Sequence, residues 1–262
     1  MGRGAIPQVK VDYEEDTFLN KDNKRTADHR PEDVILGINS DFAVAESYKS
    51  IRTNIMYSMP KSEVGKVIAV TSASAGEGKT TTSINLAITF AQMDKKILLI
   101  DCDLRKPKVH RYLKFRKNEG ISNVLCGFTT LDKVINQSVR TNLDVITSGD
   151  TPPNPVELLH SEEFMRCINV LRKVYDYIII DTPPVGVVTD AAAISKISDG
   201  VILLVKKEYT TFDMMDIAME RLKTANANLL GTVMIDSKNS SSFGNKYKAS
   251  YGYRGSFNES KK

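Results

Sequence analysis

Short hydrophobic runs alternate with amphipathic stretches through the centre of this chain. The apolar runs are rich in Val, Ile and Leu, and each has the length of a single strand. They cover residues 67–71, 97–101, 143–147, 177–181, 201–206 and 229–236. Continuous apolar runs of this length are typical of strands that helices cover on both faces. The pattern therefore predicts a largely parallel β-sheet at the centre of the molecule.

The amphipathic stretches between these runs predict helices. They cover residues 79–93, 156–175, 191–197 and 210–225. Asn154 before Pro155 is a favourable start for the second of these helices. Thr210, with Asp213 three residues later, has the form of a capping box at the start of the last one. Strands that alternate with helices predict a doubly wound α/β fold, with helices on both faces of a mostly parallel sheet.

Both ends of the chain lack this alternation. Residues 1–40 are polar and carry six Lys and Arg against eight Asp and Glu, so we expect a flexible N-terminal arm. From residue 41 to 59 apolar side chains recur at helical steps, and Pro60 ends that segment. Residues 237–262 are rich in Ser, Gly, Asn and Lys, and predict a disordered, tyrosine-rich tail. The folded domain is therefore expected to span residues 41–236.

The composition adds limits on location and partners. The 262 residues are 41% hydrophobic and 26% charged, which is ordinary for a globular domain with one large core. The net charge of +4 is small, and the basic residues form no stripe with interleaved aromatics, so nucleic acid is not an expected partner. Three scattered cysteines lack metal-ligand spacing and fit a reducing compartment. With neither a membrane-spanning run nor an apolar signal core, a cytoplasmic location is expected.

A glycine-bearing loop, Ala-Ser-Ala-Gly-Glu-Gly-Lys-Thr, begins at Ala73, after the first apolar run and before a predicted helix. Gly76 and Gly78 would let backbone N–H groups approach a phosphate chain closely. Lys79 would reach the β- and γ-phosphates, and the Thr80 hydroxyl would bind Mg²⁺. Alanine replaces the usual first glycine of such a loop. The expected site for ATP with Mg²⁺ consists of Ser74, Ala75, Gly76, Glu77, Gly78, Lys79, Thr80 and Thr81.

Aspartates follow two other apolar runs. Asp181 ends the fourth run, and a carboxylate at the carboxyl end of a central strand faces the ligand crevice, where it can hold Mg²⁺ through water. Asp101 and Asp103 stand at the end of the second run, and their spacing would place both carboxylates on one side of an extended segment. One would sense Mg²⁺ while the other accepts a proton from an attacking hydroxyl. Arg105 completes this candidate catalytic group and would pair with phosphate or with a carboxylate.

Three motifs, the phosphate loop, Ile-Asp-Cys-Asp-Leu-Arg and Ile-Asp-Thr-Pro-Pro, together resemble those of the bacterial tyrosine kinases of capsule and exopolysaccharide synthesis. The resemblance covers the chain except its first forty residues. It implies an ATP-dependent protein-tyrosine kinase with the phosphate-loop NTPase fold. On this resemblance, Lys79 and Thr80 bind ATP with Mg²⁺. Asp103 and Asp181 help to hold the metal, and Asp101 orients or deprotonates the incoming tyrosine hydroxyl.

Residues 46–52 resemble a further motif of the same family, which joins subunits into a ring. Glu46, Lys49 and Arg52 are spaced three residues apart, which places them near one helix face. Lys49 stands where the family has arginine, so the positive charge is kept but the planar bidentate fork is lost. The resemblance therefore implies a ring-like homo-oligomer, which this lysine would weaken.

The tyrosine cluster of the tail also matches this family, in which such tyrosines are the autophosphorylation sites. Tyr247, Tyr251 and Tyr253 would reach the active site of a neighbouring subunit. The tail carries six Lys and Arg against one Glu, a side-chain charge of +5, and three phosphotyrosines would add about −4.5 to −6. This arithmetic predicts that phosphorylation weakens docking of the tail on an acidic neighbouring site and loosens the ring.

The resemblance implies partners as well. Gram-positive members of the family are separate cytoplasmic chains. The cytoplasmic end of a transmembrane adaptor, of the polysaccharide co-polymerase type, activates them and recruits them to the inner face of the plasma membrane. A cognate phosphotyrosine phosphatase is the expected counterpart of the kinase.

Two other functions remain open from the residues. A partition or septum-positioning ATPase of the same fold would hydrolyse ATP without forming phosphotyrosine. Its loop usually carries a lysine where this chain has Ser74, and its membrane-targeting members end in an amphipathic helix, unlike this tail. A nucleotide-binding scaffold of a polysaccharide export machine would transfer no phosphate, although the intact aspartates argue against it.

Overall fold

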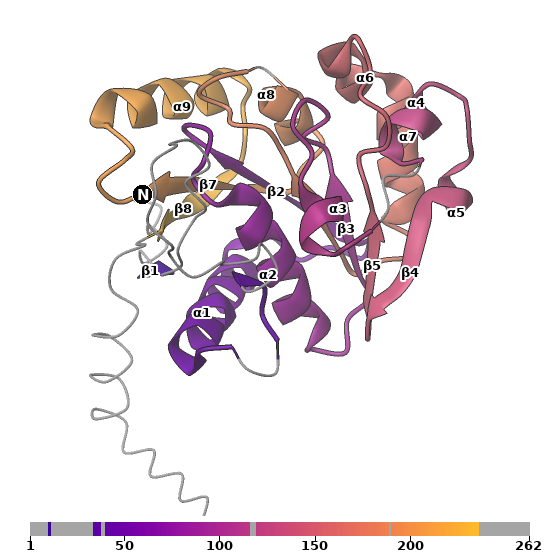
Figure 1. Cartoon of the computed structure of the whole chain (residues 1–262). Coiled ribbons are helices and arrows are strands. Elements are labelled where there is room, and N and C mark those ends of the chain that lie inside the picture. Colours follow the sequence, from indigo (N-terminus) through magenta and orange to yellow (C-terminus); the bar gives the residue numbers. More distant parts are fainter. Residues whose placement is uncertain (1–9, 12–33, 38–39, 116–118, 189, 236–262) are drawn as a thin grey trace, which may run out of the picture.

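A single mixed β-sheet forms the centre of the molecule in the computed structural model, which describes residues 10–11, 34–37, 40–115, 119–188 and 190–235 (Figure 1). In these residues the sheet has eight strands in the order β1-β8-β7-β2-β6-β3-β5-β4, and only the β4–β5 pair is antiparallel. The strands are β1 (Lys10–Val11), β2 (Lys66–Ser72), β3 (Ile97–Asp101), β4 (Ile135–Arg140), β5 (Leu143–Ile146), β6 (Tyr177–Asp181), β7 (Gly200–Lys206) and β8 (Leu229–Ile235). The predicted α/β class with a mostly parallel sheet is confirmed.

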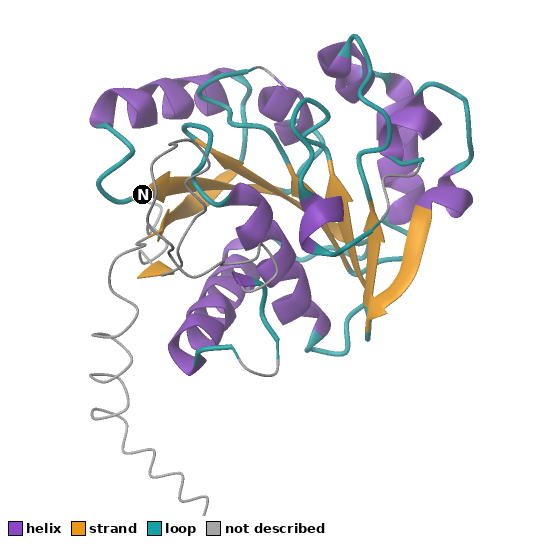
Figure 2. Ribbon diagram, viewed as in Figure 1, coloured by secondary structure: helices purple, strands orange, loops and turns teal. Residues whose placement is uncertain are grey.

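Helices cover both faces of this sheet, so the molecule has three layers (Figure 2). They are α1 (Phe42–Ser58), α2 (Lys79–Ala91), α3 (Val109–Tyr112), α4 (Ile121–Leu125), α5 (Leu131–Val134), α6 (Pro155–His160), α7 (Glu162–Leu171), α8 (Asp190–Ser195) and α9 (Phe212–Thr224). Helices α1, α2 and α3 pack on one face, and the core of the other face is made with α4 to α9. The two layers of helices bury the central strands on both faces of the sheet.

Alternate residues of the central strands face two separate cores. On β2, Ile68 and Val70 belong to the core under α1 and α2, whereas Val67 and Ala69 belong to the core on the opposite face. All four are at most 1% exposed. Because successive side chains of a strand point to opposite faces, a strand with helices on both sides must be apolar at every position. This requirement explains the unbroken apolar runs of the sequence.

Two helix predictions were wrong in detail. The helix expected over residues 156–175 is divided into α6 and α7 at Ser161, whose backbone is extended. The Ser161 hydroxyl accepts a hydrogen bond from the backbone N–H of Phe164 at 3.1 Å and so starts a new helix. The capping box expected at Thr210 does not form either, because Thr211 is the N-cap of α9 and accepts from Met214 N–H at 3.3 Å.

Four short elements had no signal in the hydrophobic pattern: helices α3, α4 and α5 and the antiparallel edge strand β4. Each of the three helices has five or fewer residues. A segment that short completes barely one turn, so it shows no helical period, and β4 is mostly half-buried or exposed. These elements are visible only in the folded chain.

Parts of the first forty residues belong to the folded unit, although the sequence pattern assigned them to a flexible arm. Strand β1 pairs in parallel with β8 at one edge of the sheet. Further along, the Leu36 N–H donates to Asn85 Oδ1 on α2 at 2.8 Å, and Asn85 Nδ2 donates to the Val34 carbonyl at 3.0 Å. Ile35 and Leu36 are buried in the core. A pair of apolar residues has no period, which is why the sequence pattern missed this contact.

Candidate active site

The phosphate loop connects β2 to α2 at the carboxyl edge of the sheet, as the sequence predicts. Gly76 and Gly78 have φ values of 79° and 80°, which only glycine adopts without strain. Ala73 is not among the described residues with positive φ, so a side chain is tolerated there in place of the usual glycine. Gly186 makes room for this loop, because a Cβ on it would lie 2.1 Å from the Ala73 carbonyl oxygen.

A cleft lies beside this loop and has two unlike walls. We call the residues 73–81 the P-loop wall; from it Gly78, Lys79 and Thr80 reach the cleft. We call the residues 103–112 the basic wall; it lines the cleft with Asp103, Arg105, Lys106, Lys108 and Tyr112. Ligands of open α/β sheets bind at the carboxyl ends of the strands, and this cleft occupies that position.

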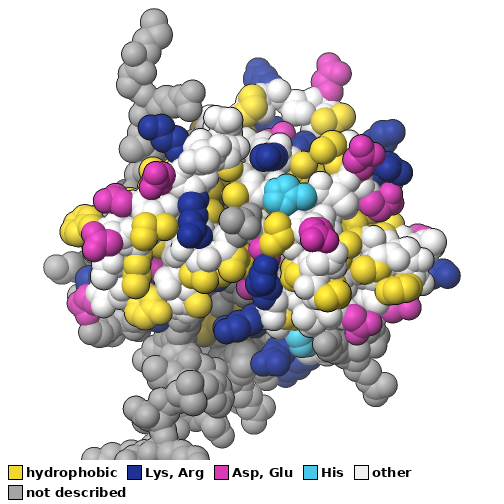
Figure 3. Space-filling model, turned by 90° about the horizontal axis from the view of Figure 1, so that it is seen from above, with side chains coloured by type: hydrophobic (Ala, Val, Ile, Leu, Met, Phe, Trp, Pro, Cys, Tyr) yellow, Lys and Arg dark blue, Asp and Glu magenta, His cyan; other side chains and the backbone are white. Residues whose placement is uncertain are grey.

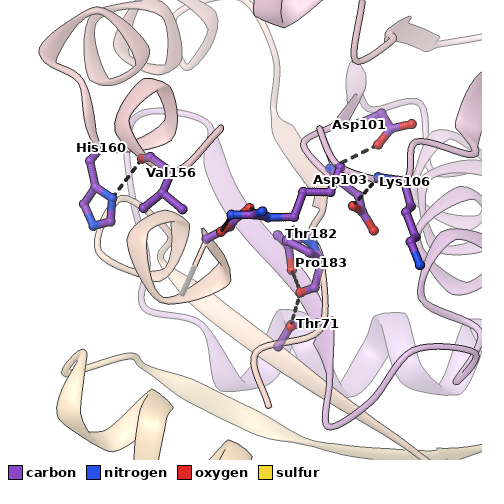
Figure 4. Close-up of polar contacts among 10 residues, drawn as sticks. Thr71, Asp101, Asp103, Lys106, Val156, His160, Thr182 and Pro183 are labelled. Atoms are coloured by element: carbon purple, nitrogen blue, oxygen red, sulfur yellow. Dashed lines mark hydrogen bonds and ion pairs between the residues drawn. The ribbon is translucent and has the colours of Figure 1, made fainter. Parts of the chain in front are cut away.

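The segment after β6 closes a third side of the cleft with Pro183, Pro184, Val187 and Val188. It is fastened to the end of β2. The Thr71 hydroxyl donates to the Pro183 carbonyl at 2.9 Å (Figure 4). The Thr182 hydroxyl donates to the Val70 carbonyl at 2.9 Å. These bonds between two neighbouring strand ends hold the apolar side of the cleft in a defined position.

The predicted nucleotide-binding residues do not all reach the cleft. Ala75, Gly78, Lys79, Thr80 and Thr81 line it. The remaining three, Ser74, Gly76 and Glu77, do not. Lys79 is only 8% exposed, so the surrounding protein, and not solvent, restricts the orientation of its side chain. The loop therefore lines the cleft with Ala75 and with the residues from Gly78 onward.

Glu77 is a buried carboxylate whose role the sequence reading missed. Its Oε2 accepts from the Ser74 N–H at 2.7 Å, and its Oε1 accepts from the Thr210 hydroxyl. Thr210 in turn accepts from the Lys206 N–H at 2.8 Å, and the Tyr209 hydroxyl donates to the Ala75 carbonyl at 3.2 Å. Burial raises the pKa of Glu77, and hydrogen bonds partly offset that effect. Glu77 thus ties the phosphate loop to the turn between β7 and α9.

Asp181 ends β6 beside the start of α2. Its Oδ1 accepts from the Ser83 hydroxyl at 3.1 Å, whereas its Oδ2 is buried and has no hydrogen-bond partner among the described residues. Burial raises the pKa of Asp181 to about 6, against the opposing effect of Lys79. An unsatisfied buried carboxylate oxygen next to a phosphate loop suits a hard cation. The described residues contain no cluster of three His, Cys, Asp or Glu that would hold a metal without help from a ligand.

Asp101 and Asp103 have different surroundings, although they are two residues apart. Asp101 is fully buried and does not line the cleft; its Oδ1 accepts from the Asp103 N–H at 3.2 Å and its Oδ2 from the Val109 N–H at 3.1 Å. Burial and the neighbouring Asp181 raise the pKa of Asp101 well above its usual value. Asp103 is partly exposed in the cleft, and its Oδ1 accepts from the Lys106 N–H at 3.0 Å (Figure 4). Of the two carboxylates, only that of Asp103 lines the cleft.

Arg105 pairs with a carboxylate, which is one of the two partners that the sequence left open. Its Nε donates to Asp190 Oδ2 at 2.8 Å and its Nη2 to Asp190 Oδ1 at 3.2 Å. Asp190 is fully buried at the first residue of α8. This bidentate pair joins the basic wall to α8 across 85 positions of sequence. No local signal pointed to Asp190 as the partner.

The candidate oligomer residues lie on α1. Glu46 and Lys49 form an ion pair of 2.7 Å, and both side chains are about two-fifths exposed. Arg52 is turned toward α2, where its Nη1 donates to the Thr89 carbonyl at 2.6 Å. The side chains of Glu46 and Lys49 are therefore partly exposed to solvent, while Arg52 is engaged within the chain. The tail tyrosines Tyr247, Tyr251 and Tyr253 lie outside the described residues.

A phosphate loop between a central parallel strand and a helix, with carboxylates at the neighbouring strand ends, defines a P-loop NTPase domain. The family model described as an AAA domain matches residues 65–232. This fold binds nucleotides at the phosphate loop.

The chain is also similar to tyrosine-protein kinases. It is 39% identical to the tyrosine-protein kinase YwqD of Bacillus subtilis (strain 168), over 80% of this chain and 86% of that protein. Among solved structures, the chimerical protein CapA2B2 is 34% identical with a TM-score of 0.74, over 88% of this chain and 94% of that one. The kinase domain of the Escherichia coli tyrosine kinase ETK is 30% identical with a TM-score of 0.76, over 88% and 91%.

The chain belongs to the family of bacterial tyrosine kinases of capsule biosynthesis. This membership agrees with the resemblance drawn from the three sequence motifs. It decides in favour of a kinase over the partition or septum-positioning ATPase of the same fold. No helix in the described ranges has the length and apolarity needed to span a bilayer.

Proposed function

We propose that this chain transfers the γ-phosphoryl group of ATP to tyrosine hydroxyls, first of all to those of its own tail on a neighbouring subunit. The observation that supports this most directly is the cleft between the P-loop wall and the basic wall, which the basic wall lines with the partly exposed Asp103. The P-loop wall is suited to bind a polyphosphate. The basic wall presents a carboxylate and several cationic side chains to a second substrate.

The P-loop wall holds the donor. Backbone N–H groups of the loop bind the phosphates, and the buried Lys79 reaches the oxygens around the bond that breaks. Thr80, Asp103 and the unpaired Oδ2 of Asp181 would hold Mg²⁺. When bound, Mg²⁺ neutralises charge that develops on the β- and γ-phosphates. Glu77 supports this wall from behind, because it fixes the loop to the turn that contains Thr210.

The carboxylates at the end of β3 place the acceptor. Both oxygens of Asp101 already accept backbone N–H groups, so in this arrangement it orients the acceptor indirectly, by fixing the segment from Asp103 to Val109. The tyrosine oxygen attacks the γ-phosphorus in line with the leaving oxygen of ADP. Because the transition state of phosphoryl transfer is loose, positioning contributes more than strong deprotonation of the hydroxyl. Asp103 is the carboxylate that faces this space.

Assembly brings the acceptor tail to the cleft. We propose that α1, through Glu46 and Lys49, contacts a neighbouring subunit in a ring, and that Tyr247, Tyr251 and Tyr253 are phosphorylated in trans. The charge of the cleft does not support the acidic docking site expected for a basic tail, since Arg105, Lys106 and Lys108 line it. If phosphorylation of the tail loosens the ring, charge repulsion at the α1 contact, or competition of the tail for that contact, explains this better than loss of tail docking in the cleft.

The proposed partners follow from the family. A solved relative is a chimera whose name joins CapA2 and B2, which supports a polysaccharide co-polymerase type of adaptor as the activator of this chain. Such an adaptor would hold a cytoplasmic kinase at the inner face of the plasma membrane. A phosphotyrosine phosphatase would reverse the modification, and the process regulated would be capsule or exopolysaccharide synthesis.

Phosphoryl transfer from γ-labelled ATP with Mg²⁺ tests the proposal. We expect tyrosine label in the wild-type chain and a large loss in the Lys79→Met variant. A chain in which all three tail tyrosines are changed to Phe should lose most of the label but still phosphorylate the tail of a Lys79→Met chain. ATP hydrolysis without any phosphotyrosine would contradict the proposal. The same variants, compared by size in solution, test whether the tail affects assembly.

A further inference from the structure

Of the three cations with which the basic wall lines the cleft, one is held in a fixed orientation by the fold. On the face of the molecule seen from above, Lys and Arg side chains follow one another across the centre (Figure 3). Lys106 and Lys108 form no ion pair with any described residue, so solvent or a ligand decides where their ammonium groups lie. Arg105 differs from them, because the carboxylate of Asp190 holds its guanidinium group.

Asp190 is a buried carboxylate whose hydrogen bonds all come from this arginine. It is the first residue of α8, which packs against α6, α9 and β2, and its side chain has no exposed surface. Both of its oxygens accept from Arg105, at 2.8 Å and 3.2 Å, and no other group in the described chain donates to them. A buried ion pair commonly adds little net stability over apolar residues of similar volume. Stability alone therefore does not account for a carboxylate at this position.

The pairing with Asp190 leaves part of the guanidinium group free. Asp190 takes the Nε–H and one N–H of Nη2, whereas a guanidinium has five N–H donors in a rigid planar fork. The three remaining donors have no partner among the described residues. The Arg105 side chain is 41% exposed, and it lines the cleft together with Lys79 and Thr80. A planar fork of N–H groups matches the oxygens of a phosphoryl group.

The segment that carries Arg105 has no other means to orient this side chain. Residues 102–108 form neither helix nor strand. Leu104 is buried in the core and so fixes the backbone. For residues 103–108, the contact with Asp190 is the one side-chain hydrogen bond to a distant part of the chain that the structure describes. What Asp190 adds is therefore the direction of the Arg105 guanidinium.

We propose that Asp190 is a positioning residue for phosphoryl transfer, which orients Arg105 so that its free N–H groups contact the γ-phosphoryl oxygens. This inference rests on the proposed kinase function. In the transfer, the tyrosine oxygen bonds to the γ-phosphorus while the bond from that phosphorus to the β,γ-bridging oxygen breaks. The bridging oxygen leaves on ADP with the electron pair, and the phenolic proton passes to solvent. A cation already oriented toward the γ-oxygens stabilises the charge of this transition state without reorganisation.

Kinetics of Asp190→Asn test the proposal. Asparagine keeps the size of the side chain but removes the charge that holds the guanidinium. The enzyme is the full chain with its three tail tyrosines changed to Phe, and the acceptor is the Lys79→Met chain. We expect kcat to fall roughly tenfold and the KM for ATP to stay within about twofold, because a contact made only in the transition state does not strengthen binding of the ground state. Unchanged kcat would overturn the proposal.

Asp199→Asn is the matched control. Asp199 pairs with Arg172 at 2.6 Å and also accepts from the Val67 N–H, so this second carboxylate–arginine pair lies at the amino end of β2, away from the cleft. Its loss should lower the thermal stability and leave kcat as it is in the parent enzyme. If Asp190→Asn likewise loses stability and keeps its kcat, the role of Asp190 is only structural and the proposal is wrong.

Arg105→Ala separates activity from folding. It should lower kcat at least as much as Asp190→Asn does, and it leaves Asp190 buried without a partner. Adding Asp190→Asn to Arg105→Ala removes that unpaired charge, so the double variant should unfold at a higher temperature than Arg105→Ala. Its kcat should nevertheless stay equally low, because Asp190 acts only through Arg105.

Three outcomes of this cycle overturn the inference and leave the kinase function in place. They are a normal kcat in Arg105→Ala, a further loss of kcat in the double variant, and a kcat that recovers together with stability. In each case the parent enzyme still forms phosphotyrosine on the acceptor chain. If the parent enzyme and the wild-type chain form no phosphotyrosine, the proposed function itself is wrong, and this inference with it.

Discussion

The two walls of the cleft hold their side chains in opposite ways. On the P-loop wall, Lys79 and Glu77 are buried, and both oxygens of Glu77 accept hydrogen bonds from within the domain. On the basic wall, Lys106 and Lys108 are exposed and lack ion pairs in the part of the chain that the structure describes. The P-loop wall is therefore preorganised for its ligand. The basic wall acts through exposed side chains whose positions can adjust to the ligand.

This difference matches the two substrates of a kinase. The phosphate chain of a nucleotide is always the same, so a fixed arrangement of backbone N–H groups and one lysine recognises it with little loss of entropy on binding. Acceptor tyrosines differ in sequence from one protein to another. Exposed lysines tolerate that variation, but their attraction is screened by salt. We therefore expect rigid recognition of the donor and graded recognition of the acceptor.

The largest effect should come from the lysines of the two walls. Lys79→Met removes a buried cation from the phosphate site and should slow phosphotyrosine formation by at least about a hundredfold. Lys106→Met removes an exposed cation from the basic wall of the same cleft and should raise the KM of a peptide acceptor severalfold instead. Initial rates at varied ATP and varied peptide separate the two parameters. Equal losses in both variants would remove the distinction between the walls.

A smaller but still clear effect is expected where the P-loop wall meets the segment after β6. In Gly186→Ala, the new Cβ would stand 2.1 Å from the Ala73 carbonyl, so the loop must shift, and nucleotide affinity should fall roughly tenfold. Gly127→Ala is the control, because Gly127 has φ of 75° but nothing within 4 Å of the added Cβ. That variant should lose about 1 kcal/mol of stability and keep its nucleotide affinity. Calorimetric titration with a non-hydrolysable ATP analogue and thermal unfolding measure the two quantities.

The tie between Glu77 and the β7–α9 turn is the next test. Thr210→Val keeps the shape but leaves Glu77 Oε1 and the Lys206 N–H without this partner, which costs about 1–3 kcal/mol. We expect lower stability together with a severalfold higher KM for ATP. Thr211→Ala removes the N-cap of α9 and should cost about 1 kcal/mol without changing that KM. A normal KM in Thr210→Val would show that the tie is only structural.

The smallest perturbation is thiol labelling, which probes how closed the carboxyl end of β3 is. Cys102 is buried directly after β3, between Asp101 and Asp103, and Cys167 is buried on α7, whereas Cys126 is exposed. Burial raises the pKa of both the Cys102 and the Cys167 thiol, so both stay protonated and unreactive near pH 8. One thiol should react with an aromatic disulfide reagent in the native protein and three after denaturation. Rapid reaction of Cys102 would mean that this end of β3 opens to solvent.

The sequence was most informative where a motif is local. The phosphate loop lies between a strand and a helix within a few residues, and its two glycines adopt the left-handed backbone that their identity suggests. The strand-end positions of Asp101 and Asp181 were also predictable, because unbroken apolar runs mark buried parallel strands. Predictions failed where a side chain caps a helix at a position that the apolar pattern does not mark. The Ser161 side chain caps α7 and so divides one predicted helix in two. Thr211, rather than the predicted Thr210, is the N-cap of α9.

Contacts between distant segments had no counterpart in the pattern. Arg105 meets Asp190 across 85 positions, and Glu77 meets Thr210 across 133. Neither pair has a sequence period or spacing that would connect its members. The separate surroundings of Asp101 and Asp103 belong here too, because Asp101 is turned inward by the Val109 N–H, which only the folded segment brings near.

By itself, the sequence determined the fold class, the phosphate site and the family, because these depend on apolar period, glycine geometry and short motifs in which neighbours along the chain act together. The tertiary structure alone decided which carboxylate faces the cleft, what Arg105 and Glu77 hold, and where the uncompensated positive charge lies. Those outcomes depend on which residues the sheet brings together at the carboxyl ends of its strands. That arrangement is a property of the packed sheet as a whole, and no short segment of the chain encodes it.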